Sequence, residues 1–523
     1  MGLKVKSRWV KKSLLWISGV LSAAIVLTGC EQIAGVDIEK WMVQNSALGS
    51  YEAKGSISLR LETSESASLN DEQREVVDLF NGMELRFNHI AMENPYEISM
   101  NGEWVSGSLS MPITMSADQD GMALNLDGIS KPIYISTSLP DEIPAEIGAI
   151  QQQFQSEYAE LMRLVSAFAF KHLPNPPEIK LSHVTEKIQG QDVNLTHVHA
   201  VVKGSDLLPI LTAFIHKVAE DEAGLKQLIS ELYDVLSPVI EGMMTMNDPG
   251  AVNSMPDKSV LVEMLYTAIQ AELPALLEQW DSWMKQADQD ETLQTLLQDD
   301  SYVSVDLYFD THGYVRKQLF DITLAPKLEA EFSSIQSIQI TGEMEYWNVD
   351  KPVEASKLDV SDALRFEGPL QPSAADFFRN VDPDSVLYEL ASMFDLNRTE
   401  LFLMPFSAKD KEMAAEWDEP FVEFGITYVP VRYVAEHLGA DVSWDRVNQQ
   451  VTIIDSLTNK EIILKINSNH AWIDGNMTAL PADTGLHLVG NKIYVPIKWL
   501  VHELGGQVEW QQQADIVIVE RVY

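Results

Sequence analysis

Residues 50 to 350 begin with a strand pattern, in which apolar and polar residues alternate one by one. This alternation is typical of strands that present one apolar and one polar face. Asn94-Pro95 and Asp118 to Gly121 separate such segments and are typical of turns. The pattern predicts antiparallel hairpins whose apolar face requires a cover. Its apolar positions include Ile57, Leu59, Leu61, Met83, Leu85, Phe87, Ile98, Met100, Leu109, Met111, Ile113 and Met115.

The pattern then changes to spacings of three and four residues, which are typical of amphipathic helices. Pro238 and Pro274 lie inside the second and third predicted helices, so we expect each proline to kink or end its helix. A hairpin over residues 179–202 is predicted between the first helix and the second. The apolar positions of the three helices include Phe154, Tyr158, Leu161, Val165 and Phe168; Leu225, Leu228, Leu232 and Val239; and Leu261, Met264, Leu265, Ile269, Leu276 and Trp280.

Strand alternation returns between Val303 and Tyr346. Residues 50–350 are therefore predicted to form one α+β domain, in which the first and last strands share a curved antiparallel sheet and the helices pack across its apolar face. The helices are rich in Met, which suits either an adaptable apolar pocket or an ordinary core. This order of elements resembles the lipoprotein folds of the LolA and LppX type. The resemblance implies a half-barrel and helices that enclose a lipid-binding cavity.

Residues 351–396 lose this periodicity and gain prolines and acidic residues. We interpret them as an acidic linker that carries a short helix near Val386 to Met393.

The C-terminal region, residues 397–523, contains an internal repeat. Pro430 and Pro496 suit the first turn of a helix, and Gly439 and Gly505 suit a left-handed helix cap. Each copy is predicted to be a β-α-β-β unit. The first copy includes Tyr428-Val429-Pro430-Val431-Arg432, Leu438-Gly439, Val442 and Trp444, and the second includes Tyr494-Val495-Pro496-Ile497-Lys498, Leu504-Gly505, Val508 and Trp510.

This repeat resembles the copper amine oxidase N-terminal-like domain, also called the stalk domain, which occurs on exported proteins of Gram-positive spore formers. The resemblance covers residues 397–523 and implies attachment or interaction in the cell envelope, without copper or a redox cofactor. The catalytic part of amine oxidases needs an Asn-Tyr pair, and this chain contains no Asn-Tyr dipeptide. Trp444 and Trp510 could stack on sugars, but their equivalent places in the two copies favour a role as core anchors.

The N-terminal segment predicts export. Five basic residues and no acidic one precede a short apolar run from Leu14 to Leu27, which is typical of a signal peptide over residues 1–29. The next residues, Leu27-Thr28-Gly29-Cys30, resemble the bacterial lipobox. This resemblance implies that Cys30 is diacylated and becomes the first mature residue, followed by a tether to residue 49. Cys30 is also the single cysteine of the chain, so intrachain disulfides are excluded.

The net charge excludes one class of partner. It is −41 for the chain, and loss of the five basic residues of the signal peptide changes it to −46. Nucleic-acid binding needs clustered Lys and Arg, so no nucleic-acid partner is expected. The charge also argues against a protein body that lies on an anionic membrane, so we expect the body to stand away from the lipid surface.

Candidate chemistry is sparse. His197 and His199 lie two residues apart on a predicted strand and could reach one metal ion, with His183 as a third ligand, but packed or solvated histidines are the favoured interpretation. Asp118 to Gly121 lacks the later ligands of a calcium loop, so a hairpin turn is preferred. We therefore predict no catalytic residue, no metal site and no cofactor.

These features favour a non-catalytic lipoprotein on the outer face of a Gram-positive cell membrane, anchored to membrane lipid through Cys30. Its α+β domain would bind an apolar ligand or an envelope protein, and its C-terminal module would make envelope contacts. Two alternatives remain open at this stage, namely a secreted hydrolase that uses acidic residues and a structural spacer without a ligand.

Overall fold

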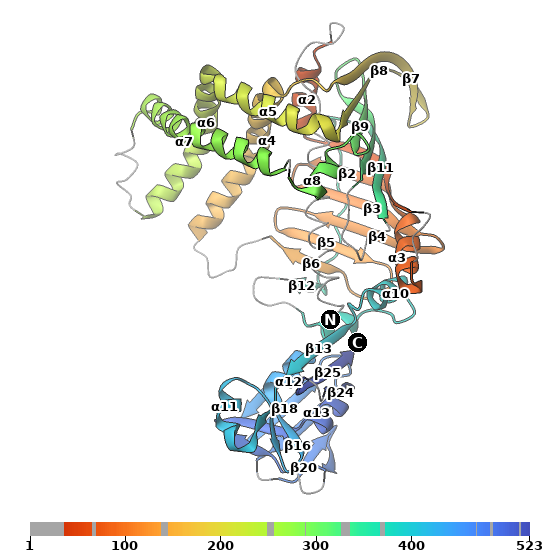
Figure 1. The fold of residues 1–523 in the computed structure, drawn as a ribbon, viewed down its shortest axis with the longest axis vertical. Coiled ribbons are helices and arrows are strands. Elements are labelled where there is room, and N and C mark those ends of the chain that lie inside the picture. The colour runs from red at the N-terminus through yellow and green to blue at the C-terminus, as the bar shows by residue number, and fades with distance from the viewer. Residues whose placement is uncertain are drawn as a thin grey trace. The chain divides into compact units, whose positions relative to one another are not determined.

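The computed structural model describes residues 36–64, 69–137, 145–247, 256–287, 289–325, 335–366, 372–466, 468–481, 485–511 and 514–523. The chain divides into two compact units (Figure 1). Unit 1 contains the described residues up to Met122 together with Thr137–Leu358, and unit 2 contains Ala123–Ser136 and Asp359–Tyr523. The predicted signal peptide and Cys30 lie outside the described residues.

Unit 1 is organised around an antiparallel sheet with the strand order β4-β3-β2-β1-β11-β10-β9-β8-β7. The first strand of the chain pairs with the last strand of the unit, which confirms that both belong to one sheet. The strands are β1 (Tyr51–Thr63), β2 (Met83–Asn94), β3 (Glu97–Ser106), β4 (Leu109–Ala117), β7 (Glu178–Ile188), β8 (Gln191–Lys203), β9 (Tyr302–Phe309), β10 (Val315–Leu324) and β11 (Ile335–Trp347).

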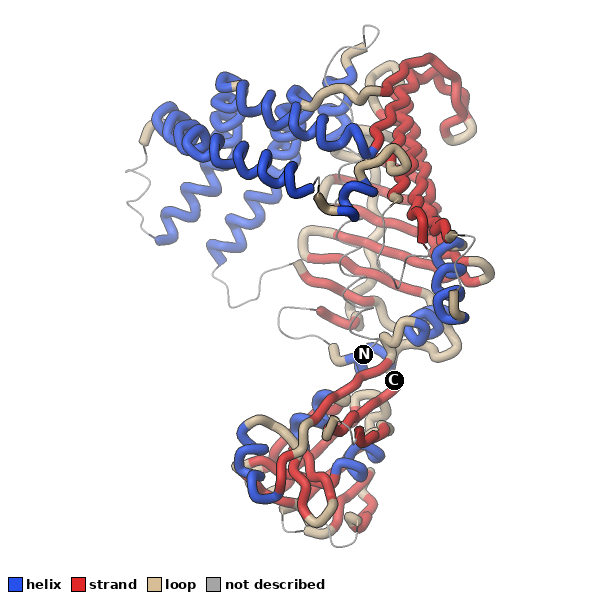
Figure 2. The backbone as a smooth tube through the Cα atoms, viewed as in Figure 1, coloured by secondary structure: helices blue, strands red, loops and turns tan. Residues whose placement is uncertain are grey.

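Most helices of unit 1 lie together beside the strands, whereas α3 (Asp71–Asn81) lies apart from this group (Figure 1 and Figure 2). Pro238 and Pro274 lie inside continuous helices, so neither proline ends its helix, and the alternative that each kinks its helix stays a prediction. The helices are α2 (Ile38–Ser46), α3 (Asp71–Asn81), α4 (Ala145–His172), α5 (Gly204–Glu220), α6 (Glu222–Asn247), α7 (Lys258–Ala287) and α8 (Glu291–Leu296).

Only part of the sheet lies under a closed core. Ile38 and Met42 of α2 and Phe170 of α4 pack against buried residues of the strands on one side of the sheet. The strand residues of this core are Val198, Val303, Val305, Leu307, Phe309, Ile322 and Ile340. Further along, α4 packs against α6, and α6 packs against α7. The α+β class is thus confirmed, although the outer helices pack on other helices.

The N-terminal part of unit 2 is held together by its own small core. Phe378, Ala391 and Tyr523 pack with Ile129 and Val381. The elements of this part are β5 (Gly121–Leu126, from Ala123 on), β6 (Ile133–Ser136), β12 (Leu364–Phe366), α9 (Ala374–Phe378) and α10 (Val386–Met393). The helix predicted near Val386 to Met393 is therefore present, with these bounds.

The C-terminal part of unit 2 contains three small sheets with the orders β13-β25-β24, β14-β15-β16-β23-β22 and β17-β18-β19-β20-β21. Their elements are β13 (Arg398–Leu403), β14 (Phe406–Ser407), η2 (Ala408–Asp410), α11 (Lys411–Glu416), β15 (Phe421–Glu423), β16 (Ile426–Pro430), α12 (Val431–His437), β17 (Ala440–Asp445), β18 (Gln450–Asp455), β19 (Glu461–Lys465), β20 (His470–Ile473), β21 (Asn476–Ala479), β22 (His487–Val489), β23 (Lys492–Pro496), α13 (Ile497–Glu503), β24 (Gln507–Gln511) and β25 (Ile516–Val522).

The repeat is confirmed as two β-α-β-β units, β16-α12-β17-β18 and β23-α13-β24-β25. The two copies share one core, because the apolar stripes of both helices lie in the same buried cluster. Pro430 and Pro496 are the residues immediately before the helices rather than part of the first turn. Trp444 and Trp510 are each 43% exposed, so the prediction that they anchor the core is wrong.

A buried ion pair lies next to this core. Arg521 of β25 and Asp455 of β18 are each 2% exposed, and their side chains are 2.8 Å apart. Arg521 also donates to the Leu438 carbonyl oxygen at 2.6 Å. Burial raises the pKa of Asp455, but hydrogen bonds from Arg521 and Thr458 outweigh burial and leave this pKa below its ordinary value. The pair connects the last strand of the chain to the first repeat.

We predict that Asp455→Asn lowers the free energy of unfolding of the full chain by about 3–5 kcal/mol, because it leaves the Arg521 charge buried without its partner. Since the folded-state pKa of Asp455 is depressed, its contribution is present above pH ~4 and is lost as the pH falls. Urea denaturation at several pH values measures both effects. Equal unfolding curves for the variant and the native chain at pH 7 would contradict this prediction.

The two repeat glycines provide a matched pair of substitutions. Gly439 and Gly505 both have a left-handed backbone, with φ of 77° and 72°. An added Cβ at Gly439 would lie 2.4 Å from the Ala375 Cβ, whereas one at Gly505 meets nothing within 4 Å. Gly505→Ala is expected to cost about 1–2 kcal/mol through backbone strain alone, and Gly439→Ala is expected to cost more. Thermal unfolding of both variants tests this order, and equal losses would contradict it.

Candidate functional site

One face of strands β2, β3 and β4 presents apolar residues in register. Directly opposed residues of an antiparallel pair point to the same face, so cross-strand rows show what that face carries. One row runs from Leu85 through Trp104 to Met111, and another runs from Ile90 through Met100 to Met115. The remaining members are Phe87, Met92, Ile98 and Ile113. We call these ten residues the open apolar face, and none of them is charged.

The open apolar face continues the face that the helices cover elsewhere. Ile57 of β1 is opposite Leu85, and Leu59 next to it is opposite Ile340 of the closed core. Nine of the ten residues keep intermediate exposure, and Met111 is the buried exception. None of the ten belongs to the hydrophobic clusters of the described residues. The same sheet face is therefore closed under α2 and α4 and partly open on β2, β3 and β4.

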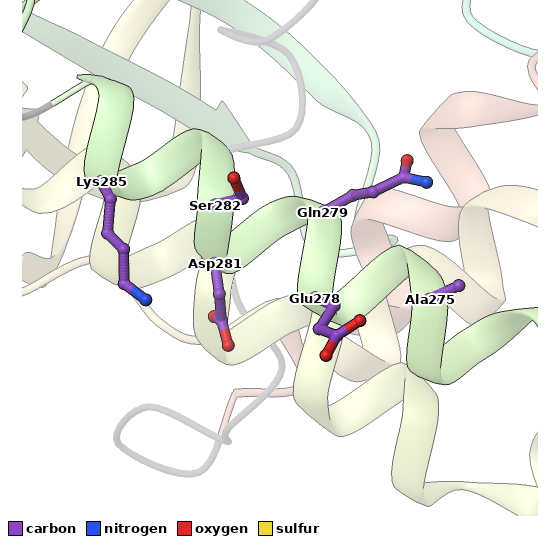
Figure 3. A pocket seen from close by; sticks show the side chains of 6 residues that line it. All are labelled: Ala275, Glu278, Gln279, Asp281, Ser282 and Lys285. Carbon is purple, nitrogen blue, oxygen red and sulfur yellow. The ribbon is translucent and has the colours of Figure 1, made fainter.

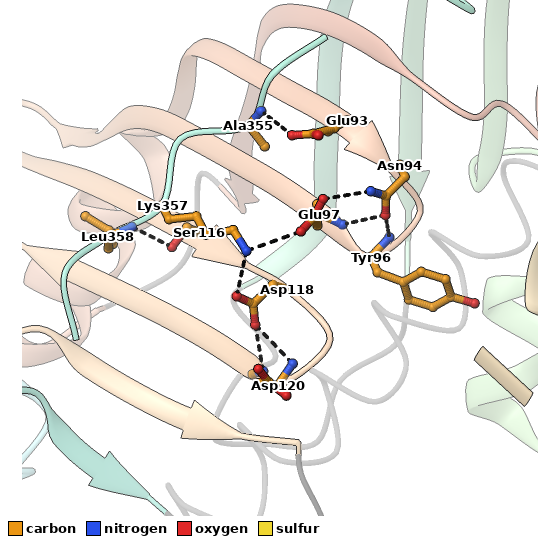
Figure 4. A network of polar contacts seen from close by, with 11 residues as sticks. Glu93, Asn94, Tyr96, Glu97, Ser116, Asp118, Asp120, Ala355, Lys357 and Leu358 are labelled. Carbon is orange, nitrogen blue, oxygen red and sulfur yellow. Dashed lines mark hydrogen bonds and ion pairs between the residues drawn. The ribbon is translucent and has the colours of Figure 1, made fainter. Parts of the chain in front are cut away.

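The opposite face of the same strands is polar and is covered by a different segment (Figure 4). Residues 355–358 cross it, and the Ala355 and Leu358 backbone N–H groups donate to Glu93 and Ser116 at 3.1 and 3.0 Å. Lys357 Nζ lies 3.2 Å from carboxylate oxygens of both Glu97 and Asp118. The polar face thus has protein partners for its charges, which leaves the apolar face as the side available to an apolar molecule.

Asp118 lies in the turn that we predicted in place of a calcium loop. Its Oδ1 accepts hydrogen bonds from the backbone N–H groups of Asp120 and Gly121 at 3.0 and 3.3 Å. Burial raises the pKa of Asp118, but these bonds and the Lys357 ammonium outweigh burial and lower it. The carboxylate therefore stabilises the turn between β4 and β5.

An aromatic contact lies between the β2–β3 turn and the helices. The rings of Tyr96 and Tyr158 are 6.5 Å apart, and in Figure 4 Tyr96 extends away from the polar network. Tyr158, Met162 and Val165 form an exposed stripe on α4 at helical spacing. The exposed stripe on α4 therefore begins at Tyr158, the residue whose ring lies next to Tyr96 of the β2–β3 turn.

The pocket drawn in Figure 3 is not the apolar pocket between sheet and helices that was one of the two alternatives for the Met-rich helices. It is an open hollow of about 530 Å³, and all of its lining residues belong to α7. Polar side chains dominate the lining, with Glu278, Gln279, Asp281, Ser282 and Lys285 beside Ala275. A hollow on one helix surface encloses no ligand, so we do not assign a binding site there.

His197 and His199 converge on a carboxylate rather than on His183. His197 Nε2 and His199 Nδ1 lie 2.6 and 2.9 Å from the same oxygen, Asp306 Oδ1 on β9. His183 pairs with Thr196, which points to the other face of β8, so the suggestion that it completes the pair is wrong. The His197 ring also stacks on Tyr308, 4.4 Å between centroids. Within the described parts of the chain, no group of three or more His, Cys, Asp and Glu residues has metal-site geometry.

Sequence reasoning identified the strands of the open apolar face but expected the helices to cover them. The alternation of Met, Leu and Ile could be read from the sequence, whereas the part of the sheet face that the helices cover could not. Helices α3, α5, α8, α9 and α11 were missed. Helix α2 lies within residues 30–49 and packs in the core, so the prediction that this whole range is a tether is wrong. For α3, the Asn70-to-Gln73 capping box was a usable signal, because both reciprocal hydrogen bonds are present. The predicted lipidation residue, Cys30, lies outside the described residues and stays a prediction.

Comparison with known families supports the interpretation of the repeat. The family described as the copper amine oxidase N-terminal domain matches residues 409–519, which fall inside the predicted range 397–523. This domain type is generally non-catalytic. The comparison with curated proteins gives no match to the chain.

Proposed function

We propose that this protein is a non-catalytic lipoprotein on the outer face of a Gram-positive cell membrane, anchored through diacylated Cys30. Unit 1 binds an apolar ligand on the open apolar face, and the C-terminal module contacts a partner in the cell envelope. The lipobox-like Leu27-Thr28-Gly29-Cys30 and the basic, apolar segment before it support the anchor. The match to a stalk-type domain supports the envelope role of the C-terminal module.

The open apolar face is the observation that carries the ligand-binding proposal. Ten uncharged residues lie in register on three strands, and nine of them keep partial exposure. Contiguous apolar surface of this kind is costly in water unless something binds it. Three of the ten residues are Met on strands β3 and β4, and Met92 adds a fourth on β2. Flexible thioether side chains adapt to apolar ligands of variable shape.

The absence of hydrogen-bonding groups within the paired rows narrows the ligand class. Apart from the indole N–H of Trp104, the side chains of the open apolar face offer hydrocarbon and sulfur surface. Such a surface favours long hydrocarbon chains over sugars or peptides, whose polar groups would lose their water without replacement. The proposed ligand is therefore a molecule with an acyl chain. This is also the ligand class that the resemblance to LolA-type and LppX-type folds implies.

We predict that Met115→Glu weakens binding of a fluorescent fatty acid at least tenfold, because it places a charge within the open apolar face. Thr114→Glu is the matched control, since its neighbouring position on β4 points to the polar face. Fluorescence titration of the Cys30→Ser chain measures both variants.

Native mass spectrometry of this chain, purified without detergent, should show a co-purified lipid. If the chain without a substitution in the open apolar face does not bind the fatty acid, the result would favour the alternative of a structural spacer without a ligand.

We predict that Cys30→Ser releases the protein into the medium or leaves an uncleaved precursor, because serine offers no thiol for acylation. Cell fractionation and the intact mass of the N-terminal peptide measure the outcome. A control substitution at Gln32 should keep the membrane association. A serine variant that remains bound to the membrane and is processed as before would refute the anchor.

A further inference from the structure

Helix α7 has an inner face that contacts the other helices. Lys226 of α6 lies 2.8 Å from Glu263 and 4.4 Å from the centroid of the Tyr266 ring. Trp280 donates from Nε1 to Thr212 of α5 at 3.1 Å. These contacts fix the rotation of α7 about its axis, so the face opposite to them points away from α5 and α6.

Beside this contacting face, α7 carries an exposed apolar stripe whose residues recur at spacings of four and seven along the helix. Among the described residues, α7 is the one helix that is long and apolar enough to cross a membrane, and none of its apolar window is buried. Its stripe residues are between 39% and 57% exposed, although the sequence pattern alone placed most of them in a core. These residues are Leu265, Ile269, Leu276 and Trp283.

The C-terminal end of α7 carries residues that are typical of helices at a membrane surface. Trp280 and Trp283 form a ring pair there, with centroids 5.2 Å apart. Lys285 lies in the last turn of the helix, whereas Lys258, the first residue, pairs with Asp234 of α6 at 2.6 Å. Aromatic rings favour the boundary between head groups and acyl chains, and long Lys side chains reach outward from it. Since the inner face of α7 is bound to α5 and α6, the helix suits a position on the surface rather than across the bilayer.

The length of chain before the described residues places a lipid anchor near this helical layer. Six residues separate Cys30 from Asp37, the N-cap of α2, so this tether spans at most about 25 Å. Helix α2 packs against α4, α4 against α6, and α6 against α7. A diacylated Cys30 would therefore hold the start of the helical layer within that distance of the bilayer.

We infer that the exposed stripe of α7 inserts into the surface of a lipid bilayer and forms a second membrane contact beside the anchor. The inference rests on the proposed lipidation of Cys30. It revises the expectation from net charge alone that the whole body stands away from the lipid. The proposed contact depends on apolar side chains and not on attraction to anionic lipid. The reason is that α7 carries more acidic residues than lysines. The acidic residues are Glu263, Glu272, Glu278 and Asp281, against two lysines.

The negative charge of α7 and of the whole chain favours a bilayer over a second copy of this chain as the partner of the stripe. A second copy would bring its own four carboxylates of α7 to the contact and a further net charge of −41 for the chain. A zwitterionic lipid surface adds no net charge. Apolar insertion also predicts that anionic lipid weakens binding, which is the reverse of electrostatic membrane binding.

The test uses the full-length Cys30→Ser chain with vesicles of phosphatidylcholine and with vesicles that contain 30% phosphatidylglycerol. Flotation is expected to show binding to the first and weaker binding to the second. Leu276→Glu, in the stripe, is expected to lower the vesicle-bound to free ratio at least tenfold. Thr267→Glu adds the same charge at an exposed position off the stripe and is expected to change this ratio less than twofold.

Three outcomes would overturn the inference. One is equal vesicle binding by the Leu276→Glu and Thr267→Glu variants, and the second is no vesicle binding by the parent chain. The third is a dimer in sedimentation that Leu276→Glu disperses, which would assign the stripe to a second copy. Fatty-acid binding at the open apolar face and membrane release by Cys30→Ser are measured separately. If those two hold while vesicle binding fails, the proposed function stands and the role of α7 falls.

Discussion

The architecture of unit 1 depends on a sheet that is apolar along one whole face but is closed over only part of it. Burial of Val198, Val305 and Ile322 under α2 and α4 supplies a core of fully excluded side chains. The same face continues through β1 to Leu85, Met100 and Met115 without the same cover. Since burial of apolar area drives folding, the closed side holds the unit together, whereas the open side keeps apolar residues partly exposed.

The polar face of the strands has the opposite role. The segment 355–358 crosses it, and Lys357 lies between two carboxylates (Figure 4). These exposed ion pairs add little to stability individually, but they provide charge partners for the acidic residues of this face. An apolar ligand would therefore meet the sheet on the other side, where the paired residues are uncharged. In the same unit, α7 presents a second apolar surface, which is separate from the open apolar face because it belongs to a different element.

The C-terminal module achieves stability in another way. Its two copies contribute Val434, Leu438, Leu500 and Leu504 to one core, so neither copy would bury its apolar stripe alone. Arg521 and Asp455 then connect the last strand to the first copy through a buried pair. The outer positions of both copies, Trp444 and Trp510, remain exposed at equivalent places.

The sequence by itself determined the types of most elements, the repeat and the α+β class, because alternation, helical spacing and capping glycines are local properties of the chain. It also located the hairpin of β7 and β8 and the helix α10, and it placed the first and last strands, β1 and β11, in one sheet. Only the tertiary structure decided which apolar residues are covered. Leu265 and Tyr266 are neighbours with similar hydrophobic character, yet one is exposed and the other contacts α6. Trp444 likewise repeats in register but points outward. A periodic pattern shows that an element has an apolar face, whereas the cover over that face is set by contacts between residues far apart in the chain.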